Sequence, residues 1–268
     1  MVGKYIYAII NSNRENYFEP SGITDCEEVY SIPYEDISCV VSDSEITDFT
    51  HMQKEALARQ LVRHQQVTEK IMEQGCTVIP IRLGTFGRDE GEVRQILSKA
   101  YPIAREIFEK VKERIEIDLA VVWSDFNAII KEIGKEPKIK EFKKLLQTNP
   151  KGITVDDQMK IGLMVKEAVD KKREAYAQRI REALKPIAIN SITHELMDDK
   201  MVVNIAFLID KATREDFDKK VEELNTIFDE KLNFRCVGPL PPYSFYTLEV
   251  KKLQYEEIDW ARKRLGLV

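Results

Sequence analysis

Three histidines are the side chains best suited to acid–base or metal chemistry, and their spacing decides whether they could perform it. His64 falls on the apolar side of a helical pattern, whereas His51 lies at the start of that helix and His194 at the end of a strand pattern. None of them belongs to a metal-ligand spacing such as H-E-x-x-H. Because catalysis by a histidine needs a nucleophile or an acid within reach, we interpret His64 as a neutral, hydrogen-bonded core residue. The alternatives are a catalytic His64 or a metal site at which all three histidines meet.

Other reactive groups also lack the patterns that catalysis requires. Ser244 stands between two aromatic residues without a G-x-S-x-G context, so its hydroxyl is expected to bond the backbone of a turn. The carboxylates sit mainly beside lysines on helix faces, which are solvated in most proteins. The cysteines are widely spaced without a C-x-x-C pair, which predicts free and mostly buried thiols at Cys26, Cys39, Cys76 and Cys236. The sequence therefore predicts no catalytic residue, no metal site and no cofactor.

Arg82 is the charged residue whose position most needs an explanation. It follows a short apolar run and precedes Gly84 and Gly87. An arginine at such a place must pair with a carboxylate or bind an anion. The two glycines could form an anion-binding backbone nest, yet the pattern is neither G-x-x-x-x-G-K-[ST] nor G-x-G-x-x-G. We expect an ion pair that locks this corner, with anion binding as the alternative. The candidate residues of this first corner are Arg82, Gly84, Thr85 and Phe86.

A second corner is predicted at residues 238–245, whose sequence is GPLPPYSF. Three prolines and a glycine in five residues cannot continue a helix, and they leave few backbone donors for a sheet. The segment is therefore expected to be a stiff, extended turn that carries two aromatic rings to a fixed place. These rings either close the edge of a core or bind a partner. The candidate residues here are Pro239, Pro241, Pro242, Tyr243 and Phe245.

The composition is that of a soluble globular protein, large enough for one big domain or two of ordinary size. Of 268 residues, 43% are hydrophobic and 32% are charged. The net charge of −5 argues against a general nucleic-acid binder, because phosphate binding needs a basic face. The longest apolar run, residues 201–209, is too short to span a bilayer, and the N-terminus lacks the pattern of a secretion signal. A cytoplasmic protein is expected.

The strands that must position these residues are marked by apolar alternation and by turn residues between them. In the first half, strands are expected at 4–10, 28–32, 37–42 and 76–82. In the second half, they are expected at 115–123, 187–193, 201–209 and 232–237. The strand at 201–209 is apolar on both faces and should be central, and the strand at 232–237 is expected to be a core strand.

Helices are expected between these strands. The first opens with a capping box at Thr50 and Gln53, and the second should kink or restart at Pro102. The stripe that should face the core on the first helix comprises Leu57, Leu61, His64 and Ile71. A capping box at Thr154 and Asp157 opens a helix of about 30 residues, or ~45 Å. This long amphipathic helix is a suitable partner-binding element.

The order of the elements indicates an α+β protein of two domains. The expected boundary near residues 112–114 gives an N-terminal domain at 1–112 and a C-terminal domain at 113–268. From residue 115, the order strand, helices, strand, strand, helix, strand is that of a ferredoxin-like split-βαβ sheet. A helical insertion at about 135–185 and a C-terminal tail are added to it. The first half follows a modified version of this plan, in which a loop at 11–27 replaces the first helix.

Three segments together resemble the F/L family of gas vesicle proteins. They are residues 80–86 (PIRLGTF), 204–210 (NIAFLID) and 238–245, and they follow the family's order and spacing over nearly the whole chain. Leu83 stands where that family often has Phe, and Leu240 stands where it often has Trp. Both replacements keep an apolar side chain.

The resemblance implies a non-enzymatic accessory protein of gas vesicle formation, either an assembly factor or a minor vesicle component. Its partners would be the hydrophobic shell subunit and other gas vesicle accessory proteins, at the vesicle and in the cytoplasm, with no nucleic-acid or membrane partner. A shell subunit with an apolar face is prone to aggregate before assembly, so a soluble partner that shields it would manage that hazard. We expect Phe86, Tyr243 and Phe245, or the strand edges beside them, to contact the shell subunit.

Two other classes of function stay open at this point. One is a small-molecule-binding regulatory module, because ferredoxin-like domains often bind metabolites although the fold alone does not fix function. The other is an enzyme with a dispersed site around Arg82 and His64, which would need a deep polar cleft that joins these two residues.

Overall fold

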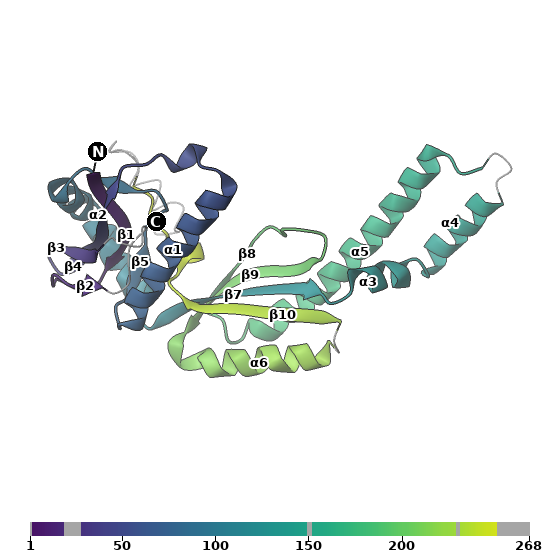
Figure 1. Ribbon diagram of the computed structural model, residues 1–268. Coiled ribbons are helices and arrows are strands. Elements are labelled where there is room, and N and C mark those ends of the chain that lie inside the picture. Colours follow the sequence, from purple (N-terminus) through teal and green to yellow (C-terminus); the bar gives the residue numbers. More distant parts are fainter. Residues whose placement is uncertain (1, 19–27, 149–151, 229–230, 251–268) are drawn as a thin grey trace. The chain divides into compact units, whose positions relative to one another are not determined.

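The structure is a computed structural model that describes residues 2–18, 28–148, 152–228 and 231–250. The chain forms two compact units, coloured along the sequence in Figure 1. The first unit contains the residues up to Ile117 together with those from Gly238 onward, and the second unit is Asp118–Val237. The segment after Gly238 therefore packs with the N-terminal part of the chain.

This division differs from the two domains expected from the sequence, 1–112 and 113–268. The local pattern changes from helix to strand near residue 113, and it gives no sign that the chain returns to the first unit. The return is made by long-range backbone hydrogen bonds: Leu248 donates to the Pro80 carbonyl at 3.0 Å and accepts from the Arg82 amide at 2.9 Å. Residues 238–250 thereby lie in the first unit.

An antiparallel sheet forms the centre of the first unit, with its strands in the order β2-β3-β4-β1-β5 and with β6 paired to β1. Its strands are β1 (Val2–Ile10), β2 (Tyr17–Phe18), β3 (Val29–Tyr34), β4 (Ile37–Glu45), β5 (Val78–Pro80) and β6 (Phe86–Gly87). The strands expected at 4–10, 28–32 and 37–42 are confirmed. The loop expected at 11–27 contains β2, and residues 19–27 lie outside the described part of the chain.

Helices α1 (Lys54–Glu73) and α2 (Glu90–Val111) cover opposite faces of this sheet. Ile6 and Val41 belong to the buried cluster that includes α2, whereas Tyr5 and Val40 belong to the cluster that includes α1. Successive residues of a strand point to opposite faces, so the two clusters are separate layers. α2 continues through Pro102 as one helix, and the restart expected there does not occur.

The start of α1 differs from the expectation in two ways. Thr50 lies in a short 3-10 helix, Phe49–His51, in which the Asp48 carboxylate accepts from the Thr50 amide at 2.8 Å. The predicted capping box is therefore wrong, because Thr50 lies outside α1 and the N-cap of α1 is Gln53, which makes no capping hydrogen bond with its side chain. Leu61 is 51% exposed, although its spacing placed it in the core stripe. The buried residues of α1 begin only at His64, so its first turns have little to pack against.

The second sheet has the strand order β10-β7-β9-β8. Its strands are β7 (Arg114–Trp123), β8 (Asn190–Thr193), β9 (Met201–Asp210) and β10 (Leu232–Leu240). β9 is central and buried on both faces, as predicted. β10 lies at the edge with most of its residues exposed, so the expectation of a core strand is wrong. Together the two sheets and their helices make an α+β protein, whereas the split-βαβ description stays a prediction.

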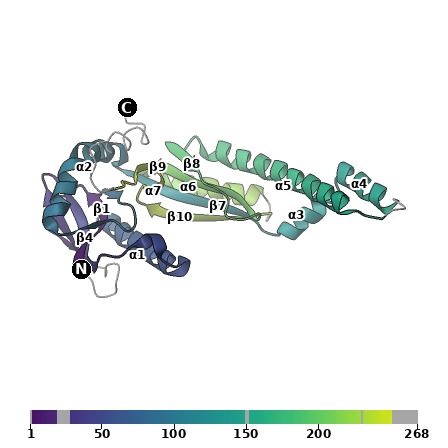
Figure 2. The same ribbon diagram turned by 90° about the horizontal axis from the view of Figure 1, so that it is seen from above.

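Four helices belong to the second unit: α3 (Phe126–Ile133), α4 (Pro137–Gln147), α5 (Val155–Leu184) and α6 (Arg214–Ile227). α5 is a continuous helix of 30 residues, and the predicted capping box of Thr154 and Asp157 is present at its start. The second half of α5 contacts β9 and α6, while its first half and α4 extend beyond the sheet as an antiparallel pair (Figures 1 and 2).

Candidate functional site: two corners side by side

The two predicted corners meet within the first unit. Ile81 and Leu248 form a parallel bridge, which is flanked by the hydrogen bonds of Leu248 with the Pro80 carbonyl and the Arg82 amide. The segment after the second corner thus continues the sheet beyond β5. Two stretches separated by about half of the chain build one structure, although the third family-like segment, residues 204–210, belongs to β9 in the second unit.

The first corner is fixed by backbone geometry. Gly84 has a φ of +82°, and a Cβ there would lie 3.1 Å from the Phe49 ring, so glycine suits this position. The Thr85 hydroxyl donates to the Arg82 carbonyl at 2.7 Å, and the Thr85 carbonyl accepts from the Ile6 amide at 2.9 Å. These bonds close a tight turn between β5 and β6.

Arg82 makes the ion pair that its position suggested. Its guanidinium lies 3.2 Å from Glu249 Oε1, and its side chain is 63% exposed, compared with 22% for Glu249. An ion pair exposed to this degree contributes on the order of 0–1 kcal/mol. The pair joins the first corner to the segment that follows the second corner.

The second corner is a strand end followed by a helical turn, rather than the extended turn that was expected. β10 continues through Gly238 and Pro239, whose peptide bond is cis, to Leu240. Residues Tyr243–Tyr246 then form the helical turn α7, with Pro242 as its N-cap. Proline fits this place because the first residues of a helix do not need to donate an intrahelical hydrogen bond.

Gly238 is required by the close approach of β7. Its φ is +146°, and a Cβ built there would lie 2.9 Å from the Glu116 carbonyl oxygen. A side chain at this place would collide with the backbone, which cannot move aside as the end of a flexible side chain can. Gly238 thus lets the second corner lie directly against β7.

Glu116 is a buried residue of this corner that the sequence did not single out. It is 1% exposed, and its two carboxylate oxygens accept from Ser244, Oε2 from the amide at 2.8 Å and Oε1 from the hydroxyl at 2.7 Å. Its partner Ser244 lies 128 residues later in the sequence, so no local pattern indicates this contact.

A polar seam connects α1 to both corners. The Tyr5 hydroxyl lies 2.7 Å from His64 Nδ1 and accepts from the Gly84 amide at 3.4 Å. One turn further along α1, the Thr68 hydroxyl makes a hydrogen bond with the Tyr243 hydroxyl. The seam therefore links α1 to the first corner through His64 and to the second corner through Thr68.

His64 is the core histidine that the sequence predicted. Burial lowers its pKa to about 4, while the backbone of Ile81 acts in the opposite direction. The imidazole is consequently neutral near pH 7, where it can donate and accept hydrogen bonds but carries no charge. His51 is exposed at the end of the 3-10 helix, and His194 follows β8 in the second unit.

The aromatic rings of the corners are packed inside the first unit. Phe245 is 8% exposed, and Tyr243 is half-buried with its hydroxyl on α1. Phe86 packs edge-on against Tyr5 at 5.2 Å between ring centres and lies 6.1 Å from Phe49. Pro241 and Pro242 are also buried, so the exposed candidates are Arg82 and Pro239. Contact of these rings with a partner stays a prediction.

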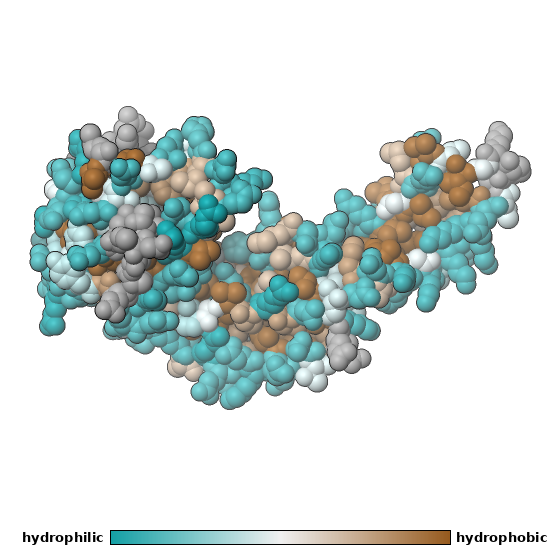
Figure 3. All heavy atoms as spheres, in the orientation of Figure 1, coloured by the Kyte–Doolittle hydropathy of each residue, from teal (hydrophilic) through white to brown (hydrophobic). Residues whose placement is uncertain are grey.

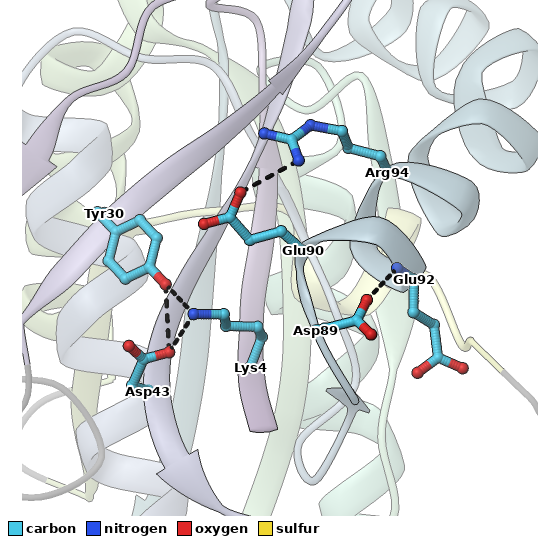
Figure 4. A network of polar contacts seen from close by, with 7 residues as sticks. All are labelled: Lys4, Tyr30, Asp43, Asp89, Glu90, Glu92 and Arg94. Carbon is cyan, nitrogen blue, oxygen red and sulfur yellow. Dashed lines mark hydrogen bonds and ion pairs between the residues drawn. The ribbon is translucent and has the colours of Figure 1, made fainter. Parts of the chain in front are cut away.

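A second polar cluster, which sequence reasoning also missed, lies across three neighbouring strands (Figure 4). Lys4 of β1 donates to the Tyr30 hydroxyl of β3 at 2.6 Å and to Asp43 of β4 at 2.5 Å. Burial lowers the pKa of Lys4, but the hydrogen bonds to Asp43 and Tyr30 outweigh it, and the net shift is upward. Burial also raises the pKa of Tyr30. Both pKa values move further above pH 7. A pKa far from the operating pH suits a structural hydrogen bond better than proton transfer.

Two other kinds of reactive group are the cysteine thiols and clusters of possible metal ligands. Burial raises the pKa of the Cys39 and Cys76 thiols, and protonated thiols are poor nucleophiles. Of the three cysteines that the structure describes, Cys39 is buried, Cys76 is half-buried and Cys236 is exposed, so the expectation of mostly buried thiols is wrong. Within residues 2–18, 28–148, 152–228 and 231–250, no three His, Cys, Asp or Glu side chains gather as metal ligands would. Cys26 lies outside the described residues.

Among the described residues, no helix combines the length and the apolar character that crossing a bilayer requires.

Comparisons with known proteins agree with the resemblance seen in the three segments. A family model described as "Gas vesicle synthesis protein GvpL/GvpF" matches residues 3–247. Gas vesicle protein F of Nostoc sp. is 27% identical over 245 residues, which cover 91% of this chain and 97% of that protein. Gas vesicle protein F1 of Halobacterium salinarum is 21% identical over 248 residues, covering 92% and 93% of the two chains.

Solved structures share the fold. The crystal structure of GvpF from Anabaena sp. matches with a TM-score of 0.76 and 25% identity, over 92% of this chain and 99% of that chain. GvpF from Microcystis aeruginosa matches with a TM-score of 0.74 and 24% identity, over 92% of this chain and 100% of that chain. Since the family model spans nearly the whole chain, the chain belongs to the gas vesicle synthesis protein GvpL/GvpF family.

Proposed function

We propose that the protein is a non-enzymatic accessory factor of gas vesicle formation. It binds the hydrophobic shell subunit, other gas vesicle accessory proteins or both, as an assembly factor or as a minor vesicle component. The observation that carries this proposal is the family match over residues 3–247. It extends through both units, so the proposal concerns the whole described architecture and not one borrowed domain.

The non-enzymatic part of the proposal is supported by the chemistry of the corners. His64 is neutral because burial lowers its pKa to about 4, and burial raises the pKa of Tyr243 above its usual range. Groups that move a proton in catalysis work best with a pKa near the operating pH, and both of these are displaced from it. Glu116 is held by Ser244 in a turn, which is a structural use of a carboxylate.

We assign the corner residues a structural role in this function. Gly84, Thr85 and Phe86 close the first corner, and the prolines with Tyr243 and Phe245 seat the second one against α1 and β5. The paired corners hold the first unit in the form that partners recognise. We also propose that the second sheet is a ferredoxin-like split-βαβ sheet, supported by its strand order and by the helices α3, α4 and α5 between β7 and β8.

Affinity capture of a co-expressed gas vesicle shell protein, and then of the other accessory proteins, tests the proposed function. The wild-type chain is expected to capture at least one of them. If it captures none, and if buoyant vesicles form normally in cells that lack the gene, the proposed function is wrong.

Two variants separate a structural role of the corners from direct contact with a partner. Phe245→Ala changes a buried ring, whereas Arg82→Ala changes an exposed side chain whose ion pair contributes on the order of 0–1 kcal/mol. A structural role predicts that Phe245→Ala lowers the melting temperature and the capture together, while Arg82→Ala captures normally. Loss of capture by Arg82→Ala at an unchanged melting temperature would make the corners the contact surface instead.

A further inference from the structure

The second sheet has one long strand at its edge. In the strand order β10-β7-β9-β8, β10 has a neighbouring strand on one side, and it is nine residues long. It forms one margin of the sheet in Figures 1 and 2. The backbone groups along the other side of an edge strand can pair with a further strand. The part of β10 that belongs to the second unit, residues 232–237, is therefore a template for strand addition.

The other sheet edges are short or covered. β8, at the opposite edge of the same sheet, has four residues. In the first unit, β2 has two residues, and the loop before it continues the pairing because the Ser31 amide donates to the Asn16 carbonyl at 3.0 Å. Beyond β5, Leu248 forms hydrogen bonds with Pro80 and Arg82. Short and covered edges protect a sheet from unwanted strand pairing, and among the described residues β10 is a long edge with neither protection.

The outer side of β10 is open to solvent. Asn233, Arg235 and Cys236 are exposed, and Val237 is 52% exposed. Successive residues of a strand point to opposite faces, so three exposed residues in a row leave both faces of the strand open. Within the part of the chain that the structure describes, no loop or helix forms a backbone hydrogen bond with residues 232–237. Figure 3 shows hydrophobic and hydrophilic residues side by side over the second sheet, above α6 in this view.

The pairing with β7 indicates which backbone groups point outward. The Lys231 carbonyl accepts from the Ser124 amide, just after β7, at 3.0 Å, whereas the start of β7 lies against Gly238. The two strands are therefore antiparallel, and Lys231 faces β7. Alternate residues of such a ladder direct their N–H and C=O groups to opposite sides. Phe234 and Cys236 thus present these groups at the open edge, where an extended backbone can pair with them.

The side chains of this edge indicate which strand would suit it. Arg235 and Val237 are two positions apart and share a face of the strand. Among the described residues, no carboxylate forms an ion pair with Arg235. Opposite charges and β-branched residues that face each other on neighbouring strands stabilise the pairing. The complementary strand therefore has a carboxylate two positions from a β-branched residue. Residues 232–237 (LNFRCV) contain no carboxylate, so the same edge of a second copy would not supply one.

We infer that the open edge of β10, over residues 232–237, binds an extended strand of another protein that carries a carboxylate and a β-branched residue two positions apart. The backbone of that strand pairs with Phe234 and Cys236, and its carboxylate faces Arg235. The inference goes beyond the proposed function, because it follows from the sheet edge and not from the family match.

The test uses the isotope-labelled full chain and a blocked peptide of about seven residues, Thr-Val-Thr-Glu-Thr-Val-Thr. Its order is the same from both ends, so it suits either strand direction. At about 1 mM peptide, hydrogen exchange followed by NMR should slow by about twofold or more at the amides of Phe234 and Cys236. The same peptide with methylated backbone nitrogens cannot donate and should have no effect. No slowing with the first peptide, or equal slowing with both, would overturn the inference.

Two variants at one position locate the backbone contact. Cys236→Pro removes an outward N–H group, while Cys236→Ser keeps it and is the matched control. The peptide should slow exchange at Phe234 in Cys236→Ser but not in Cys236→Pro. Equal slowing in two folded variants of the same melting temperature would overturn the inference. So would sedimentation showing a dimer that Cys236→Pro abolishes, because a second copy would then occupy the edge.

A charge reversal tests the choice of partner and leaves the backbone of β10 unchanged. In Arg235→Glu, a peptide with lysine in place of glutamate should slow exchange at Phe234 more than the glutamate peptide does, whereas the wild type should show the opposite preference. The exposed position of Arg235 makes loss of the fold an unexpected result. A preference for the glutamate peptide in both proteins would overturn the inference.

Discussion

At the scale of single residues, the first unit depends on buried polar side chains whose partners are distant in sequence. Ser244 donates hydrogen bonds to Glu116, and Tyr243 makes a hydrogen bond with Thr68. The partners are separated by 128 and 175 residues in the sequence. Removing one partner of a buried hydrogen bond costs more free energy than the bond contributes, because the group that stays buried cannot form hydrogen bonds with water instead.

Ser244→Ala should destabilise the first unit by roughly 1–3 kcal/mol, since the buried Glu116 Oε1 loses the hydrogen bond from the Ser244 hydroxyl. Denaturant unfolding measures the change in the free energy of unfolding, and hydrogen exchange of the amides in β7 measures the change near Glu116. Ser191→Ala, at an exposed position of β8, is the control and should stay close to the wild type. A Ser244→Ala protein with wild-type stability would show that the bond to Glu116 contributes little.

His64 should make stability fall as the pH is lowered. Its folded pKa of about 4 lies below the ordinary value of 6.5, so the unfolded chain binds the proton more readily. The contribution of the neutral ring is complete above about pH 6.5 and is lost toward pH 4, with roughly 2–3 kcal/mol at stake. His64→Gln should flatten this part of the stability profile, although the carboxylates still titrate in both proteins.

The control for that profile is His51→Gln, which replaces an exposed histidine instead of a buried one. Urea unfolding at several values between pH 7 and pH 4 provides the comparison. If His64→Gln follows the wild-type curve, the histidine is not neutral through burial in the folded protein.

At the scale of elements, the corners are strand ends and short turns that work only with particular backbone shapes. Gly238 lies against the backbone of β7, whereas Gly162 lies in the exposed, uncrowded first half of α5. The same substitution should therefore have opposite effects at these two places.

Gly238→Ala should destabilise the protein by roughly 1–3 kcal/mol or more, because its φ of +146° and the Glu116 carbonyl at 2.9 Å both exclude a Cβ. Gly162→Ala should stabilise α5 by about 0.5–1 kcal/mol, because a helical interior favours alanine and nothing lies within 4 Å of the added methyl group. Thermal unfolding of both variants gives the test. A stabilising Gly238→Ala would contradict the close approach of the second corner to β7.

The elements also show which parts of the fold can be read from sequence. The capping box of Thr154, the buried β9 and the core position of His64 were predictable, because periodicity and capping are local signals. The exposure of Leu61 was not, since it depends on where the sheet ends beneath α1. The edge position of β10 was not predictable either, because strand order is decided by long-range pairing.

The candidate site shows the same limit. The glycines and prolines of both corners were identifiable, because their backbone constraints belong to single residues. That Ile81 pairs with Leu248, and that Ser244 binds Glu116, could not be inferred from a sequence without a known contact between its two halves. Residue types indicated where the chain turns, but not what lies next to the turn.

At the scale of the whole molecule, residues 241–250 complete a unit that begins some 240 positions earlier. Phe245 and Leu248 are buried there, and the backbone of Leu248 satisfies groups at the end of β5. The C-terminal part of the described chain is therefore as much a part of the first unit as its strands are.

A chain that ends after Leu240 should lose amide protection in β5 and in the turn that follows it, whereas a chain that ends after Val250 should retain it. The shorter chain lacks the hydrogen bonds of Leu248 with Pro80 and Arg82 and leaves Glu116 without Ser244. Hydrogen exchange read by mass spectrometry distinguishes the two truncations. Equal protection in both would mean that the segment after Leu240 is dispensable for the first unit.

The assembly of one unit from both parts of the chain has a consequence for its folding during synthesis on the ribosome. Residues 118–237 must be translated before Ser244 and Leu248 exist, which takes about 6–24 s at 5–20 residues per second. During that interval the carboxylate of Glu116 in β7 lacks its hydrogen bonds from Ser244, and the backbone at the end of β5 lacks its hydrogen bonds with Leu248. A newly made molecule should therefore become protease-resistant in this region only after Ser244 and Leu248 have been synthesised, which limited proteolysis of stalled nascent chains of different lengths would show.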